Sequence, residues 1–388
     1  MIFRELLANQ LEEKKTDFTE FSVAQRDSLE VYLSKIQRLE QTSLEEIQEQ
    51  FKYKEETGAM PSAELWQHKI FAIPFPQIWN NHEESRKWAF EILQNRTTFA
   101  VDGSQIPPTR DFSLTVAAVQ VGWFENPHSD KVRYEKNAEF FILSPSDLMP
   151  SPAETRVSER RIEEEVRKTK QFLEKKRGWR ERGERMPLAF YDNTLLVPFP
   201  LSTDSKGKYI KEMQDLILLS AQTQVPLVGY VARSYAKDLI TFLDEFDNEK
   251  ANEDLLFDAD VLFPRVLQFW GDRTCFCYAK RKGLIEYFGD TIGFVYLQTT
   301  GQSSPARIDI PSWIYEKGLL NEVLDVIRAE CIIGLGYPYA LETADQTAVI
   351  TTQDREIFYR ALQDFAKREK LDFTVSRKAA SKGRRRQK

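Results

Sequence analysis

One short stretch constrains the fold more than any other part of the chain: Phe99-Ala100-Val101-Asp102-Gly103-Ser104-Gln105. An apolar run ends in a carboxylate, and a glycine follows at once. A second apolar run, rich in β-branched residues, extends from Phe112 to Phe124. This pattern predicts a strand, a tight connection and a second strand, with Asp102 at the mouth of a buried sheet. Because burying an unpaired charge is costly, a bound metal ion would explain the carboxylate.

A second aspartate lies in a comparable position. The apolar run from Pro187 to Leu196 contains Asp192, and a glutamate-rich segment lies between the two runs. Each aspartate alone is also consistent with a simple cap on a strand or turn. The pair in this order favours a carboxylate cluster for Mg²⁺ or Mn²⁺, which prefer oxygen ligands.

Length and composition narrow the class of protein. A chain of 388 residues with 41% hydrophobic residues forms one large domain or two smaller ones. We expect no membrane association, because no apolar run is long enough to span a bilayer and residues 1–15 are too charged for a signal peptide. The three cysteines fit neither a zinc site nor a disulfide framework, which predicts a reducing, cytoplasmic location. They are Cys275, Cys277 and Cys331.

The charge of the chain is unevenly distributed. The formal net charge is −6, yet residues 377–388 contain seven basic residues and no acid, so the rest carries −13. A basic tail of this composition, taken as residues 371–388, is predicted to be disordered. It either binds phosphate, with Arg384, Arg385 and Arg386 as candidate DNA contacts, or binds an acidic partner, or only adds solubility.

Periodicity predicts the order of the elements. Residues 1–55 have apolar residues at helical spacing, which predicts a long amphipathic helix or helical hairpin that packs on the body or on a partner chain. That stripe consists of Leu29, Leu33, Ile36 and Leu39. Further helices are expected near residues 79–94, 154–176, 208–223 and 234–246. Strands are expected near residues 97–102, 112–124, 132–143, 187–192 and 226–232.

Three successive strands, followed by helix, strand, helix and strand, are the order of a ribonuclease H-like α/β domain. In the third strand, Val132, Tyr134, Phe140 and Ile142 are expected on the apolar side. The predicted fold class is α/β, a ribonuclease H-like mixed sheet flanked by helices. The predicted domains are a helical extension over 1–95, the α/β domain over 96–370 and the tail over 371–388.

Several motifs together resemble the NurA nuclease family. They are Asp102-Gly103-Ser104, the Arg- and Glu-rich helix, Asp192-Asn193-Thr194-Leu195, Arg233-Ser234-Tyr235-Ala236-Lys237, Pro305 to Pro311, and Gly336 to Asp345. The resemblance covers roughly residues 95–365, and the collinear order of the motifs supports it. It implies a Mn²⁺-dependent, dimeric DNA nuclease that works with a hexameric HerA-type ATPase in DNA end processing.

The resemblance assigns metal ligands residue by residue. Asp102 matches the aspartate of the first strand and Asp192 that of the fourth strand. The helix should add a glutamate. Helical phase places Glu165 beside the buried stripe, Glu163 at its other shoulder, and Glu164 pointing away, so Glu165 is favoured and Glu163 is kept as the alternative.

The C-terminal motif and two basic residues complete the candidate site. Tyr337 matches a tyrosine of the family. Asp345 stands where relatives often have a histidine, and a carboxylate still binds metal but does not replace imidazole as a proton donor near neutral pH. Lys237 is a candidate phosphate contact or a surface lysine, and Arg307 either contacts DNA or pairs with an acid.

The predicted function is therefore metal-dependent hydrolysis of DNA phosphodiester bonds. Two Mn²⁺ or Mg²⁺ ions held by Asp102, Asp192, Glu165 and Asp345 would activate water and stabilise the leaving oxygen. The expected role is 5′–3′ end resection in double-strand break repair, by a homodimer. The alternative is a catalytically impaired adaptor that binds DNA or an ATPase ring without cleavage.

Overall fold

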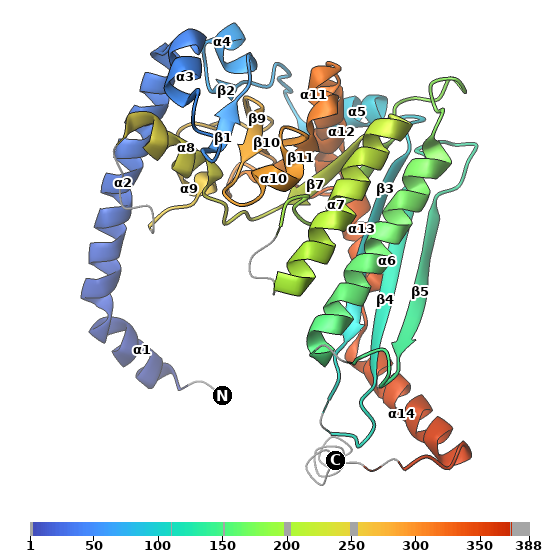
Figure 1. Ribbon diagram of the computed structural model, residues 1–388. Helices are drawn as coiled ribbons and strands as arrows, with labels where there is room; N and C mark the ends of the chain where they lie inside the picture. Colours follow the sequence, from blue (N-terminus) through green and yellow to red (C-terminus); the bar gives the residue numbers. More distant parts are fainter. Residues whose placement is uncertain are drawn as a thin grey trace. The chain divides into compact units, whose positions relative to one another are not determined.

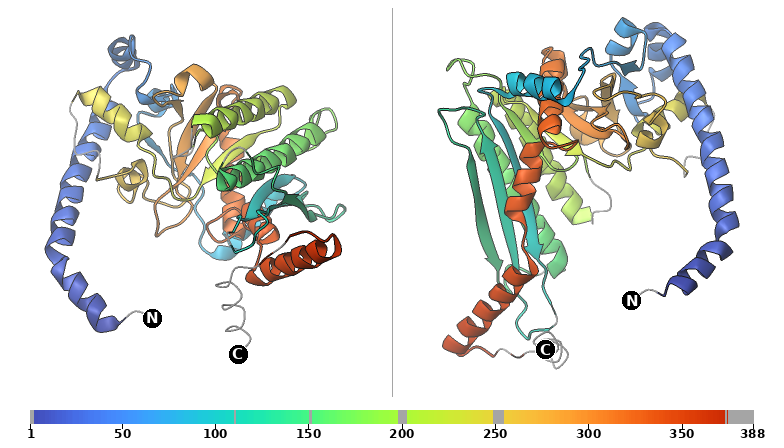
Figure 2. Two further views of the ribbon diagram at one scale, coloured as in Figure 1. Left: turned by 60° about the horizontal axis from the view of Figure 1, so that its bottom comes forward. Right: turned by 180° about the vertical axis from the view of Figure 1, so that it is seen from behind.

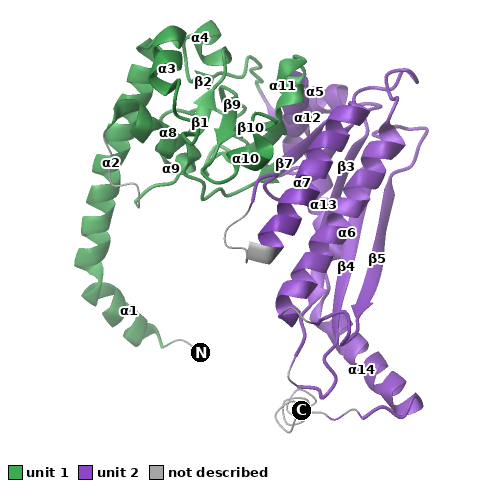
Figure 3. Cartoon of the chain, in the orientation of Figure 1, with its two compact units in different colours: residues 1–80, 230–320 green, residues 81–229, 321–388 purple. Residues whose placement is uncertain are grey.

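The structure is a computed structural model that describes residues 3–109, 111–149, 152–197, 203–248, 255–372 and 374. The chain forms two compact units, shown in different colours in Figure 3. Unit 1 comprises residues 1–80 and 230–320, and unit 2 comprises residues 81–229 and 321–388. Each unit is thus assembled from two separate parts of the sequence.

Unit 2 contains the strands of the predicted ribonuclease H-like order. Their spatial order is β7-β6-β3-β4-β5. Strands β3, β4 and β5 pair antiparallel, whereas β6 runs parallel to β3 and β7 parallel to β6. The bounds are β3 (Thr98–Ile106), β4 (Ala117–Asn126), β5 (Glu135–Leu143), β6 (Leu188–Tyr191) and β7 (Leu227–Val231). The mixed sheet flanked by helices confirms the predicted fold class.

Helices lie on both faces of these strands. Helices α6 and α7 run along one face and α13 along the other, as Figures 1 and 2 show. Phe99 of β3 stacks on Phe172 of α6, with 4.5 Å between ring centroids, which fixes the face that α6 covers. The helices of unit 2 are α5 (His82–Leu93), α6 (Ala153–Lys176), α7 (Thr203–Thr223), α12 (Leu320–Ile333), α13 (Tyr339–Ala348) and α14 (Thr352–Arg368).

The first two predicted strands are displaced in the structure. Strand β3 does not end in a tight connection at Gly103 but continues to Ile106, and β4 begins at Ala117 rather than near residue 112. The apolar residues around the connection are used elsewhere. Ile106, Val116 and Ala118 form a buried cluster with Ile350, which precedes α14, and with Phe358 of α14, so this end of the sheet packs against that helix.

Strand β5 lies at the edge of the sheet and is mostly exposed. The side chains predicted to form its apolar side are not buried: Val132 is 58% exposed, Tyr134 63%, Phe140 46% and Ile142 62%. Phe140 meets Phe358 of α14 at 6.1 Å between ring centroids. The predicted apolar side is therefore largely exposed, and Val132 and Tyr134 precede the strand, which begins at Glu135.

Unit 1 has strands of its own in the order β1-β9-β10-β11, in which all three pairs are antiparallel. Strand β8 pairs with β10 and with β2. The strands are β1 (Gly58–Pro61), β2 (Ala72–Ile73), β8 (Arg273–Thr274), β9 (Cys277–Lys280), β10 (Ile292–Leu297) and β11 (Ala306–Pro311). The N-terminal segment thus contributes strands as well as the predicted helices.

The helices of unit 1 are α1 (Arg4–Glu13), α2 (Lys15–Gln41), α3 (Leu44–Phe51), α4 (Glu64–His68), α8 (Asp238–Asp247), α9 (Asp258–Leu262), α10 (Ile285–Phe288) and α11 (Ser312–Glu316). The predicted amphipathic helix is α2, which packs on α8 and α9. Its buried stripe includes Tyr32, Ile36 and Leu39. Lys35 is also buried there because its ammonium group pairs with Asp244 at 2.6 Å.

The three cysteines are buried and carry free thiols. Across the described ranges, no helix combines the length and the apolar character needed to cross a bilayer. The predicted domain boundaries near residues 95 and 370 stay predictions, and of the basic tail only residues 371, 372 and 374 belong to the described part.

Candidate functional site

The two strand aspartates are neighbours across the sheet. Strands β3 and β6 pair in parallel register from Thr98–Leu188 to Val101–Tyr191. Asp102 and Asp192 are the residues that come directly after the last of these pairs. The register therefore places the two carboxylates side by side where the β3–β6 ladder ends, on unit 2.

Helix α6 places Glu165 beside Gly103, the residue that follows Asp102 on β3. Glu165 is 8% exposed, and its approach depends on Gly103. A Cβ atom at Gly103 would lie 2.5 Å from Glu165 Oε1 and 2.5 Å from Arg161 Cγ. Only glycine leaves room for both helix side chains at this point of β3. The sequence indicated a turn at this glycine. In the structure the strand continues, and the missing side chain leaves space beside it.

Helix α13 and the loop before it approach from the other face. Gly122, the partner of Asp102 on β4, faces α13, because a Cβ atom there would meet Ala348 N at 2.6 Å. Successive side chains of a strand alternate between faces, so Asp102 lies on the α13 side and Gly103 on the α6 side. Tyr337 Oη donates a hydrogen bond of 2.8 Å to Asp192 Oδ1.

The carboxylates lie close enough to perturb one another. Burial raises the pKa of Asp102 to about 6, and repulsion from Asp192 and Asp345 adds to the rise, while the Gly103 N–H and Arg161 oppose it. Burial likewise raises the pKa of Glu165 to about 8, again with repulsion from Asp102 and Asp192. Burial is thus the main cause of both shifts, and the neighbouring carboxylates add to it.

The side chains nearer the surface follow the same pattern. Asp192 is exposed, yet desolvation of its carboxylate and repulsion from Asp345 raise its pKa, against the hydrogen bond from Tyr337 and the charge of Arg161. Burial and the neighbouring Asp192 raise the pKa of Tyr337 well above its usual range, so the phenol stays protonated and acts as a donor. Asp345, on α13, is exposed.

The donor set fits a hard divalent cation. Asp102, Glu165, Asp192 and Asp345 offer only oxygen ligands, and repulsion among them is what a doubly charged ion relieves. Within the described ranges, however, no three Asp, Glu, His or Cys side chains are arranged to hold a metal ion as they stand. The residues therefore supply the right chemistry, and ion binding requires the carboxylates to converge further.

The other two glutamates of α6 have different surroundings. Glu163 pairs with Arg156 at 2.9 Å and is partly exposed. The predicted orientation of Glu164, away from the buried face, implied a side chain directed to solvent. The structure contradicts this prediction. Glu164 is 4% exposed and lies between Arg160 and Arg167, each at 2.6 Å. Two ion pairs stabilise the buried charge, and they occupy its carboxylate.

The basic residues predicted to contact DNA lie in other surroundings. Arg307 is buried in unit 1, where it donates to Asp238 at 2.6 Å and Asp309 at 2.7 Å. This arrangement matches the ion-pair alternative and leaves the guanidinium no access to a phosphate. Lys237 is the N-cap residue of α8 in unit 1, with its ammonium group 5.6 Å from the centre of the Phe257 ring. Arg384, Arg385 and Arg386 lie outside the described residues.

Sequence reasoning missed two residues of the site. Arg161 lies on α6 one turn before Glu165, and Gly103 provides the gap through which both reach β3. The spacing of four between Arg161 and Glu165 indicates an ion pair on a helix, but so do many pairs on this helix. Nothing local distinguishes this pair from the others.

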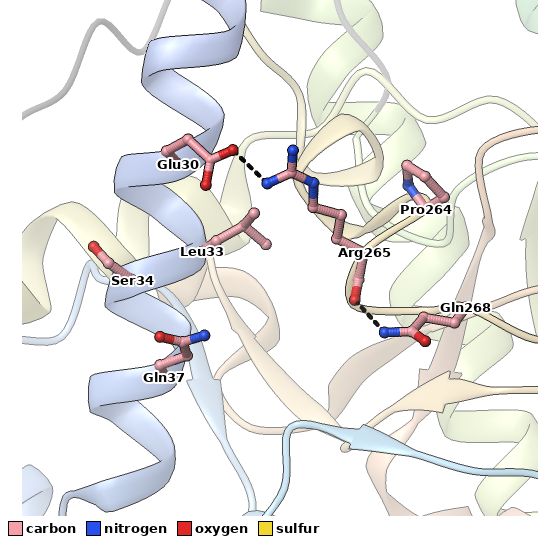
Figure 4. A pocket seen from close by; sticks show the side chains of 7 residues that line it. All are labelled: Glu30, Leu33, Ser34, Gln37, Pro264, Arg265 and Gln268. Carbon is pink, nitrogen blue, oxygen red and sulfur yellow. Dashed lines mark hydrogen bonds and ion pairs between the residues drawn. The ribbon is translucent and has the colours of Figure 1, made fainter.

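A pocket on unit 1 has a different character. It has a volume of about 590 Å³ and lies between α2 and the segment after α9 (Figure 4). Glu30 and Arg265 pair with each other across it, and its other polar groups include Ser34 and Gln37. Its lining offers a single carboxylate that is already paired, so it does not suit a metal centre.

Fold and site define the class: a ribonuclease H-like α/β protein with an acidic centre at the end of its parallel strand pair. Comparison with protein families identifies the NurA domain over residues 96–350, more than half of the chain. The protein belongs to the NurA domain family. This membership supports a nuclease, as the sequence motifs predict.

Solved structures show more distant likenesses. The NurA nuclease from Sulfolobus solfataricus is 15% identical, with 75% of this chain and 92% of that chain covered and a TM-score of 0.46. A NurA solved with manganese is 9% identical, with 86% and 96% covered and a TM-score of 0.39. The catalytic domain of human endonuclease V is 14% identical, with 73% and 96% covered and a TM-score of 0.32. No curated protein matches the sequence.

Proposed function

We propose that this protein is a metal-dependent deoxyribonuclease whose active centre consists of Asp102, Glu165, Asp192 and Asp345. One observation carries the proposal: burial and mutual repulsion raise the pKa values of Asp102, Glu165 and Asp192 at one point of the NurA domain. Perturbed carboxylates that converge from separate elements are typical of functional sites.

The chain's own residues have distinct tasks in this proposal. Asp102 and Asp192 are fixed by the parallel register of β3 and β6, and Glu165 by the gap at Gly103. Bound divalent ions would supply Lewis acidity for the phosphodiester and an activated water. Tyr337 holds Asp192 in place through its hydrogen bond and keeps its proton.

Further details rest on the resemblance to the family. We propose Mn²⁺ or Mg²⁺ as the metal, two ions per centre, and a homodimer located in the cytoplasm. We also propose that it processes DNA ends, by 5′–3′ resection in double-strand break repair, with a HerA-type hexameric ATPase. A NurA has been solved with manganese, which supports the choice of metal.

The experiment compares cleavage of an end-labelled DNA duplex by the purified wild type, Asp102→Ala and Asp192→Ala, with Mn²⁺ present and after EDTA treatment. Cleavage should need the metal and should be lost in both variants. The matched control is Asp130→Ala, which removes an exposed aspartate of the same unit. Full activity in either active-centre variant would refute the proposed centre.

A second function, that of a DNA-binding or ATPase-binding adaptor without cleavage, is favoured by one observation. As the described side chains stand, no three of them are arranged as metal ligands. The same assay separates the two functions. An adaptor would bind the duplex and leave it intact with Mn²⁺ in the wild type as well as in the variants.

A further inference from the structure

The guanidinium of Arg161 lies beside Glu165 at the acidic centre. Arg161 Nη1 donates a hydrogen bond of 3.2 Å to the carbonyl oxygen of Gly103. Its Nε lies 3.7 Å from Glu165 Oε1, which is an ion pair but too long for a hydrogen bond. That Nε is buried and has no hydrogen-bond partner in the structure. Nη1 of Arg161 is therefore hydrogen-bonded, whereas its buried Nε–H group is not.

Arg161 acts on three acids at once. Its charge opposes the upward pKa shifts of Asp102, Glu165 and Asp192. Arg161 makes no hydrogen bond to any of these three carboxylates in the structure, and its side chain is 35% exposed. Its interaction with them is therefore weak. A long side chain held in this way can turn outward without breaking a close ion pair.

The neighbouring Arg160 differs from Arg161, because a close ion pair holds its side chain in place. Arg160 Nη2 lies 2.6 Å from Glu164 Oε1, and Glu164 is bound on its other side by Arg167. Arg161, and not Arg160, is among the main charges that lower the pKa values of Asp102, Glu165 and Asp192. The two adjacent arginines thus differ in one respect: of the two, Arg161 faces the acidic centre.

We propose that Arg161 is the resident counter-cation of this centre, which positions Glu165 in the metal-free protein and competes with the divalent ion for the carboxylates. The inference rests on the proposed metal-dependent function. A positive charge beside the site repels an incoming cation, so Arg161 lowers metal affinity and turns outward when the ion binds. Arg161 is a positioning residue, and its removal should strengthen metal binding rather than weaken it.

The test measures Mn²⁺ affinity of the full chain by isothermal titration calorimetry. Arg161→Gln should bind Mn²⁺ more tightly than the wild type, by on the order of tenfold, because one neighbouring charge is removed. Arg161→Lys keeps the charge and should bind with nearly the wild-type affinity. Arg160→Gln is the matched control and should also leave the affinity nearly unchanged. A residue that only supports the fold would change affinity in the opposite direction.

Thermal unfolding supplies a second readout. Without metal, Arg161→Gln should unfold at a lower temperature than the wild type, because its carboxylates lose their counter-charge. Added Mn²⁺ should raise the unfolding temperature more in Arg161→Gln than in the wild type. The comparison with Arg161→Lys separates loss of charge from loss of packing.

The outcomes distinguish this proposal from the proposed function. If the wild type binds Mn²⁺ and Arg161→Gln binds it equally or more weakly, the competing role of Arg161 is refuted and the metal centre stands. If neither protein binds Mn²⁺, the metal-dependent function and the role of Arg161 are both refuted.

Discussion

Gly103→Ala is the perturbation that the geometry of the centre constrains most closely. The added methyl group would lie 2.5 Å from Glu165 Oε1 and 2.5 Å from Arg161 Cγ. Ordinary contact begins at 3.4 Å, so each neighbour must retreat by about 0.9 Å. The backbone of Gly103 is not in the left-handed region, and alanine is therefore tolerated there by the main chain. The effect is purely steric.

The size of the effect follows from this displacement. Inserting a methyl group into a well-packed interior costs about 1–3 kcal/mol of unfolding free energy. A misplacement of about 1 Å in a catalytic group lowers activity by roughly 10²-fold. Urea denaturation and metal-dependent cleavage of a DNA duplex measure the two effects. Cleavage should fall by more than the loss of stability explains, because the folded protein itself has a displaced Glu165.

Gly207→Ala is the matched control. Gly207 lies in α7 of the same unit, and a Cβ atom there meets nothing within 4 Å. Because alanine favours helix over glycine by about 1 kcal/mol, this variant should be more stable than the wild type and equally active. Wild-type cleavage by Gly103→Ala would show that the contact between β3 and Glu165 has no part in the reaction.

Three other perturbations test separate parts of the chain. Glu165→Gln should reduce metal-dependent cleavage far more than Glu164→Gln. Because Glu164 is bound by two arginines, Glu164→Gln should mainly lower the thermal midpoint of unfolding. Equal reductions in cleavage would contradict the assignment of Glu165 to the centre. Arg307→Ala should destabilise unit 1 by about 3–5 kcal/mol, since it removes the ion-pair partner of buried carboxylates. Although burial acts to raise it, Arg307 and Arg281 hold the pKa of Asp238 at about 2, so its stabilisation is present above the unfolded pKa near 4 and is lost as the pH falls towards 2. Acid denaturation curves of wild type and variant should therefore differ most above pH 4. Deletion of residues 377–388 should reduce the slope of log affinity for DNA against log salt by about 0.9 for each phosphate that the tail neutralises, and an unchanged slope would exclude DNA binding by the tail.

The order of strands and helices in unit 2 was predictable because it rests on local periodicity. The neighbouring positions of Asp102 and Asp192 follow from that order, since two aspartates at the ends of adjacent parallel strands meet at one edge. The strands β1 and β2 were not predictable. They have four and two residues, and they pair with β9 and β8 at least 200 positions away. Their pairing is set by tertiary contacts and leaves no local signal.

Helical phase succeeded for one glutamate and failed for its neighbour. It places Glu165 towards the interior, and the structure does the same. It directs Glu164 away from the buried face, whereas Glu164 is buried between Arg160 and Arg167. Phase analysis assumes that charged residues avoid the interior. That assumption fails wherever the same helix supplies the opposite charge at a spacing of three or four residues.

Gly103 shows why the centre itself was harder to predict than the strands around it. A glycine that follows an apolar strand indicates either a turn or a close approach by another part of the chain, and the sequence does not distinguish them. The distinction depends on Arg161 and Glu165, which lie about 60 residues later on a helix whose position is fixed only in the folded protein. Once α6 lies across β3, the missing side chain at Gly103 leaves room for these two residues beside the strand. Glu165 and Arg161 thus both occupy the space that Gly103 leaves, and a single methyl group at Gly103 should displace both.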